Sequence, residues 1–298
     1  MIVETQNVQK YFGKVSAVRN LNLRVPEGSV FALIGTNGAG KTTTLRTLVN
    51  ILKPDSGCIS ICGVDSRSLT AKDFFNIGYV SENQKLPEKL SIDQYFSFLR
   101  SLYPTWDREL EMKILKSFYL PPKRKIGQLS HGMRMKTILT AALSFRPRLL
   151  IMDEPLSGLD TLVRDEVIDG LLDLAGETTI LISSHELAEI ESFTTNIAFM
   201  AEGNLHFQES IDSLRNRFRE ISVTLSEVKT LPADYPHSWL RPSISEHILE
   251  YIDSAFISEE ATYDQLTEHF GAIQFRETPM NLKDISIALI REVREATN

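Results

Sequence analysis

The sequence has only two cysteines in 298 residues, Cys58 and Cys62. So few cysteines exclude a disulfide framework and favour a reducing compartment. The two residues bound the strand-like segment CISIC, where a rise of about 3.3 Å per residue puts them roughly 13 Å apart on one face. Because this separation is too long for a disulfide and unfavourable for a shared metal ion, we predict that both are small buried hydrophobic residues.

An apolar run long enough to span a bilayer is also absent. Such a helix needs ~20 apolar residues, and neither the N-terminal segment nor any later one approaches that length. We therefore expect a chain that is soluble by itself and that contacts a membrane only indirectly, through a partner. The net charge of −7 lacks the basic excess that nucleic-acid binding requires, so no nucleic-acid partner is expected.

One glycine-rich segment, GTNGAGKT, has the form G-x-x-x-x-G-K-[ST] of a phosphate-binding loop. Its glycines let the backbone turn successive N–H groups toward phosphate oxygens, and the helix that follows adds its positive N-terminal end. We predict that Lys41 reaches the β- and γ-phosphates of ATP and that Thr42 ligates Mg²⁺. The residues predicted to contact the nucleotide here are Gly35, Thr36, Asn37, Gly38, Ala39, Gly40, Lys41, Thr42 and Thr43.

Two acidic residues follow the buried-strand pattern LLIM, in the segment LLIMDEP. They would lie at the carboxyl edge of a parallel sheet, where α/β proteins bind their ligands. We predict that Asp153 holds Mg²⁺ and that Glu154 orients or deprotonates the attacking water. Taken alone, two acids at a strand end are equally well explained as caps of the next helix.

Four further motifs follow one another in the chain: GYVSE, LSHGM, SGLD and the pair Ser184-His185. Together with the phosphate loop and LLIMDEP, they resemble the Q-loop, signature (LSGGQ), D-loop and switch histidine of the nucleotide-binding subunits of ATP-binding cassette (ABC) transporters. The resemblance covers about residues 1–210 and implies ATP hydrolysis that drives a membrane transporter. LYPTWD, LSHGMRMK and the C-terminal tail are similar to the ABC-2-type branch, which is often assigned to export.

The resemblance also implies a site shared by two chains. Ser130 and Gly132 of the signature would face the phosphate loop of a second cassette, in a homodimer or with a related subunit. His185 would contact the γ-phosphate and the attacking water. Asp160 of the D-loop would contribute to the same composite ATP site.

Adenine is expected to stack on an aromatic ring near the first strand, with Phe12 as first choice and Tyr11 as second. Three positions depart from the family pattern. Glu82 stands where the family has glutamine; its carboxylate can ligate Mg²⁺ but adds negative charge near the γ-phosphate. His131 replaces a signature glycine, and Met133 replaces the signature glutamine. For His131 we expect a solvent-facing side chain or an extra contact across the dimer.

Strand-like and helix-like segments alternate, which predicts an α/β fold. We expect a P-loop NTPase core with a mostly parallel sheet, an antiparallel β N-terminal part, a helical subdomain at about 85–145, and a small C-terminal α+β accessory domain. The predicted boundaries are 1–210 for the ATPase domain and 211–298 for the accessory domain. One helical stripe is interpreted as core packing in preference to a docking surface: Tyr95, Phe98, Leu99 and Leu102.

The resulting hypothesis is a cytoplasmic ATPase, peripheral to the inner face of the cell membrane. Its predicted partners are separately encoded transmembrane permease subunits and a second cassette. The alternatives are a nucleotide-dependent regulator that scarcely hydrolyses ATP, and a soluble ABC-type ATPase that acts on nucleic acid or ribosomes. Glu154 argues against the first, and a single cassette with a short spacing between its nucleotide motifs argues against the second.

Overall fold

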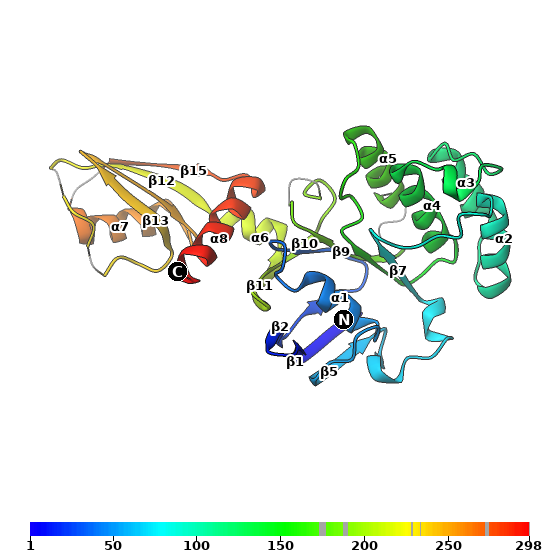
Figure 1. Ribbon diagram of the computed structural model, residues 1–298. Coiled ribbons are helices and arrows are strands. Elements are labelled where there is room, and N and C mark those ends of the chain that lie inside the picture. Colours follow the sequence, from blue (N-terminus) through cyan, green and yellow to red (C-terminus); the bar gives the residue numbers. More distant parts are fainter. Residues whose placement is uncertain (173–176, 187–189, 228, 233, 272–273, 298) are drawn as a thin grey trace. The chain divides into compact units, whose positions relative to one another are not determined.

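The computed structural model describes residues 1–172, 177–186, 190–227, 229–232, 234–271 and 274–297. The chain divides into two compact units, Met1–Gln208 and Glu209–Asn298, and many of their helices and strands are labelled in Figure 1. Among the described residues, no helix combines the length and the apolar character that crossing a membrane requires.

The centre of the first unit is a mostly parallel sheet. Its strands are β4 (Val30–Ile34), β7 (Ile77–Ser81), β8 (Leu149–Asp153), β9 (Thr179–Ser184), β10 (Asn196–Ala201) and β11 (Asn204–Ser210). In the described part of the chain their order is β11-β10-β4-β9-β8-β7. Strands β4, β8 and β9 pair in parallel and are buried along their whole length. Burial on both faces explains why their sequences are continuous apolar runs.

A second sheet in this unit is antiparallel. It contains β1 (Val3–Phe12), β2 (Val15–Leu21), β3 (Arg24–Val25), β5 (Ser56–Ile61) and β6 (Val64–Asp65). Helix α1 (Lys41–Leu48) contributes Leu45 and Leu48 to one buried cluster with residues of both sheets. The predicted α/β fold, with its parallel core and antiparallel N-terminal part, is confirmed.

The prediction that both cysteines are buried is wrong, because Cys58 is exposed and Cys62 is half-buried. In β5 the side chains alternate, and Ile59 and Ile61 take the positions that face the core. Cys58 therefore points the other way. Cys62 follows the end of the strand, at a positive φ of 51°.

Between β7 and β9 in the sequence, the described residues form four α-helices: α2 (Ile92–Leu102), α3 (Arg108–Ser117), α4 (His131–Ser144) and α5 (Thr161–Leu172). The interpretation of the α2 stripe as core packing is wrong for Phe98 and Leu102, which are 57% and 49% exposed. Helix α2 instead buries Ile92 and Phe96, which lie one turn apart on another face.

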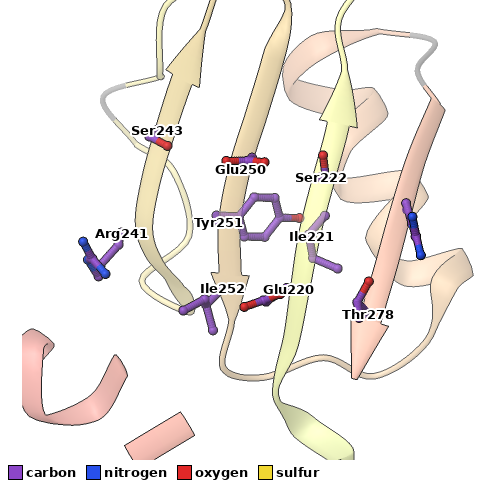
Figure 2. A pocket seen from close by; sticks show the side chains of 10 residues that line it. Glu220, Ile221, Ser222, Arg241, Ser243, Glu250, Tyr251, Ile252 and Thr278 are labelled. Carbon is purple, nitrogen blue, oxygen red and sulfur yellow. The ribbon is translucent and has the colours of Figure 1, made fainter. Parts of the chain in front are cut away.

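The second unit contains a four-stranded antiparallel sheet in the order β13-β14-β12-β15. The helices and strands of the second unit are α6 (Ile211–Arg217), β12 (Arg219–Thr224), β13 (Trp239–Ser245), β14 (Ile248–Asp253), α7 (Glu259–Phe270), β15 (Gln274–Pro279) and α8 (Leu282–Thr297). One face of the sheet forms an apolar core with α7, in which Trp239 stacks on Tyr251 with 4.2 Å between ring centroids. The other face carries an open polar hollow of about 490 Å³, lined partly by Glu220, Glu250 and Arg276 (Figure 2).

Asp253 provides a test of the core of the second unit. This carboxyl is only 4% exposed, and its burial raises its pKa. A carboxyl group whose pKa is raised by folding contributes stability at pH values below its pKa in the unfolded state. This contribution is lost as the pH rises through its pKa in the folded state. The substitution Asp253→Asn is therefore expected to raise the unfolding temperature of this unit at neutral pH, and to raise it less in acid.

The measurement is thermal unfolding of the full chain followed by tryptophan fluorescence. A Trp106→Phe background leaves Trp239 as the single reporter, and it lies within the second unit. The exposed Asp264→Asn substitution in α7 is the control. A gain for Asp253→Asn that is equal at neutral and acid pH would contradict the role given to burial of the charge.

Candidate functional site

The phosphate loop connects the carboxyl end of β4 to α1 and borders a cleft of about 570 Å³. Most of the loop residues predicted from the sequence line this cleft, and so do Glu82 and Glu154. Its lining is Val15, Ser16, Ala17, Arg19, Asn37, Gly38, Ala39, Gly40, Lys41, Thr42, Thr43, Glu82, Glu154, Glu202 and Gly203.

Two glycines of the loop are required by the close approach of other backbone segments. A Cβ on Gly35 would lie 2.0 Å from the carbonyl oxygen of Met200, and a Cβ on Gly40 would lie 2.4 Å from that of Ala17. Gly40 also has a φ of 102°, in the region that disfavours any residue with a Cβ. Contacts with β2 and β10 therefore fix the path of the loop.

Lys41 is 5% exposed and lies back across the loop that precedes it. Its Nζ donates to the carbonyl oxygens of Gly35, at 2.7 Å, and Thr36, at 3.3 Å. The same Nζ lies 3.1 Å from Oε1 of Glu154. A buried ammonium group with these partners at the cleft is suited to a phosphate, whose oxygens would compete for its hydrogen bonds.

The residues predicted to hold Mg²⁺ lie together at the carboxyl edge of the sheet. Thr42 Oγ1 donates to Oδ1 of Asp153 at 2.9 Å, and Asp153 is only 4% exposed. The backbone N–H of Glu82 donates to the carbonyl oxygen of Asp153, which brings the end of β7 to the same edge. No group of three or more His, Cys, Asp or Glu side chains suited to a metal occurs among the described residues. A hydroxyl and a carboxylate nevertheless fit Mg²⁺, which takes few protein ligands and completes its shell with phosphate oxygens and water.

Glu154 connects Lys41 and His185. His185 Nδ1 lies 2.8 Å from Oε2 of Glu154, whereas Lys41 approaches the other carboxylate oxygen. Because a carboxylate can only accept, Nδ1 carries the proton in this hydrogen bond. Glu154 also adopts a positive φ of 51°, an uncommon conformation for a residue with a Cβ. Glu154 thus links the three residues predicted to be catalytic, because it contacts both of the others.

The signature residues are not brought to the cleft of their own chain. Ser130 caps α4 by accepting the N–H of Met133 at 3.3 Å, so the signature lies at the start of a helix. Gly132 lies against α5, because a Cβ there would be 2.7 Å from Cγ1 of Val163. Asp160 accepts the N–H of Val163 at 3.0 Å at the start of the same helix. Their contact with a nucleotide in a second chain stays a prediction.

His131 is exposed, as expected, but it also has a partner within the chain. Its Nε2 lies 3.2 Å from the carbonyl oxygen of Ser157. A carbonyl oxygen only accepts, so Nε2 is the donor. This bond joins the first residue of α4 to the SGLD segment.

The aromatic residues predicted to stack on adenine end β1. Phe12 and Tyr11 are 49% and 43% exposed, which leaves their faces accessible. The described lining of the cleft includes neither ring, although it includes Val15, the cross-strand partner of Phe12. Stacking on either ring stays a prediction.

Six lining residues were missed by the sequence analysis. They are Val15, Ser16, Ala17, Arg19, Glu202 and Gly203. They belong to two β-hairpins that carry no nucleotide motif, and the N–H of Gly203 donates to the carbonyl oxygen of Ala39 in the loop. The available signal was the turn-forming Glu202-Gly203 pair, which has positive φ at both residues.

Comparison with known proteins finds sequences and structures that are similar to this chain. The sequence profile described as ABC transporter matches residues 18–157. The chain is 27% identical to the ABC transporter ATP-binding protein YtrB of Bacillus subtilis, over 96% of this chain and 97% of YtrB. It is 33% identical to the bacitracin transport ATP-binding protein BcrA of Enterococcus faecalis, over 74% of this chain and 72% of BcrA.

Among solved structures, a dimeric ATP-binding cassette in a post-hydrolysis state with ADP and Pi resembles this chain with a TM-score of 0.62. The two are 24% identical, and the match covers 70% of this chain and 98% of the cassette. At this identity the likeness shows that the fold is shared.

A matched pair of glycine substitutions tests the packing of the loop. Gly40→Ala is expected to weaken ATP binding by at least ~10-fold, or about 1.4 kcal/mol, because the new Cβ overlaps the carbonyl oxygen of Ala17. Gly38 also has a positive φ, of 83°, but a Cβ there meets no atom within 4 Å. Gly38→Ala should therefore weaken ATP binding less than Gly40→Ala does. Equilibrium titration with a fluorescent ATP analogue measures both. Equal losses would show that backbone conformation, and not the close contact, limits the loop.

Proposed function

This chain belongs to the ABC transporter family and is an ATP-binding, ATP-hydrolysing subunit, and we propose that two such cassettes close on two ATP molecules to drive a separately encoded membrane subunit. The observation that supports the proposal best is the meeting of groups from three segments of the chain at one sheet edge. These groups are Lys41, Thr42, Asp153, Glu154 and His185.

Each group has a role that follows from its contacts. Lys41, now shared between two carbonyl oxygens and Glu154, would bind the β- and γ-phosphates. Thr42 and Asp153 would hold Mg²⁺, which neutralises charge on the phosphate oxygens when bound. Glu154 would orient the attacking water and accept its proton, and His185 would hold the carboxylate of Glu154 through Nδ1. Glu82 lines the same cleft, and its carboxylate would add negative charge near the γ-phosphate.

The second cassette supplies the parts that are absent from the cleft of one chain. Ser130 and Gly132 lie at the start of α4, where the free N–H groups and the positive end of the helix favour a phosphate. The dimeric cassette of the same fold supports this assembly. We propose that the two sites are completed in trans, each by the signature of the other subunit.

Membership of the family supports a proposal for the partner and the location. We propose that residues 1–210 form the ATPase domain, which attaches to a permease at the inner face of the membrane, and that residues 211–298 form an accessory domain. The relative BcrA is named for bacitracin transport, which supports a role in moving a compound across the membrane, and we propose export as the direction. Reconstitution with a multi-span membrane protein encoded by a neighbouring gene tests the proposed partner and location. ATP hydrolysis should then depend on that membrane protein.

The substitution Glu154→Gln tests the hydrolytic role. It is expected to retain ATP binding and to lower turnover by about 10²–10⁴-fold, the usual contribution of a general base. Because closure would no longer be followed by hydrolysis, the variant should accumulate as an ATP-bound dimer in size-exclusion chromatography. Glu202→Gln, at another carboxylate of the same cleft, is the control and should keep its turnover. A wild-type chain that shows no Mg²⁺-dependent turnover, alone or with the membrane partner, would refute the motor function.

The substitution Lys41→Ala tests the binding role. It removes a charge-assisted contact worth about 1.5–3 kcal/mol, which corresponds to a loss of roughly 10- to 100-fold in ATP affinity. Isothermal titration calorimetry measures the loss, with the exposed Lys53→Ala as the control. Unchanged ATP affinity in Lys41→Ala would remove the basis for assigning the loop to phosphate binding.

A further inference from the structure

We propose that Ser183 is the positioning residue that holds the metal-binding Asp153 and the catalytic Glu154 in their mutual arrangement. This inference rests on the function proposed above, and it adds a residue to which the ABC motifs of this sequence assign no role. Ser183 is fully buried near the end of β9, directly opposite Asp153 in the parallel pairing of β8 and β9.

The single hydroxyl of Ser183 contacts both acidic residues. Its Oγ donates to Oδ1 of Asp153 at 3.0 Å, and it accepts the backbone N–H of Glu154, also at 3.0 Å. The direction of both bonds is fixed by chemistry, because an amide N–H can only donate and the one hydroxyl hydrogen is then free for the carboxylate. The hydroxyl of Ser183 therefore orients the side chain of Asp153 and the backbone of Glu154.

The bond to Glu154 holds a strained part of the chain. Glu154 has a φ of 51°, which disfavours a residue with a side chain and which persists only where surrounding contacts hold it. This conformation lets its carboxylate lie between Lys41 and His185. Without the Ser183 acceptor, the N–H of Glu154 would be buried with one partner fewer, and the conformation would lose a restraint.

The bond to Asp153 complements that of Thr42. Both hydroxyls donate to the same oxygen of Asp153. Thr42 belongs to the phosphate loop, and Ser183 belongs to the adjacent strand β9. Thr42 is the expected metal ligand, whereas Ser183 acts on Mg²⁺ only through the orientation of Asp153. Groups that orient metal ligands in this way affect metal affinity or activity by about 10- to 100-fold when removed.

The experiment compares Ser183→Ala with Ser183→Thr, which keeps the hydroxyl. Two quantities are measured on the full chain: the affinity for a fluorescent ATP analogue in EDTA, and the Mg²⁺ concentration that gives half of the Mg²⁺-dependent gain in that affinity. For Ser183→Ala we expect little change in EDTA, about a 10-fold higher Mg²⁺ requirement, and turnover lower by about 10- to 100-fold. Ser183→Thr should return both the Mg²⁺ requirement and the turnover most of the way to wild type.

The control is Ser144→Ala. Ser144 is also a fully buried serine, but its Oγ donates to the carbonyl oxygen of Thr140 within α4. Its loss should lower stability without changing the Mg²⁺ requirement. If Ser183→Ala behaves like Ser144→Ala, with an unchanged Mg²⁺ requirement, Ser183 is merely structural and the proposal is wrong. The binding measurement needs no hydrolysis, so it tests Ser183 even if turnover, and with it the motor function, fails in the wild type.

Discussion

The parallel pairing of β4, β8 and β9 is the constraint on which the site depends. Parallel strands place their carboxyl ends at one edge, and the register here sets Ile34 opposite Ser184 and Asp153 opposite Ser183. The phosphate loop, the two acids and the switch histidine therefore leave the sheet at the same place, although more than a hundred residues separate Thr42 from Asp153. A shift in this register would separate these groups.

The charged groups at this edge are arranged around buried partners. Lys41 and Asp153 are each about 5% exposed or less, so each requires compensating contacts. The phosphate loop supplies carbonyl oxygens to Lys41, and two hydroxyls supply hydrogens to Asp153. Glu154 links Lys41 to His185, because each of its carboxylate oxygens contacts one of them. An incoming phosphate would compete for Lys41 and would therefore change the partners of Glu154.

Other parts of the chain have contacts of their own. His131 joins α4 to the carbonyl oxygen of Ser157, so the signature helix and the SGLD segment are tied together within one chain. On α2, Phe98 and Leu102 are exposed, and the buried side of that helix consists of Ile92 and Phe96. The second unit has its own apolar core between its sheet and α7, while the opposite sheet face is polar (Figure 2).

The sequence alone determined the phosphate loop, the strand runs and the positions of Asp153, Glu154 and His185, because each depends on a local pattern: glycine spacing, a continuous apolar run, or a residue directly after a strand. The burial of Cys58 and Phe98 was predicted wrongly, because strand alternation and helix periodicity do not say which face meets the core. Only the tertiary structure brought Ser183 to both acids and the two hairpins to the cleft. Those contacts depend on pairing between strands far apart in the chain, and local residue patterns carry no information about that register.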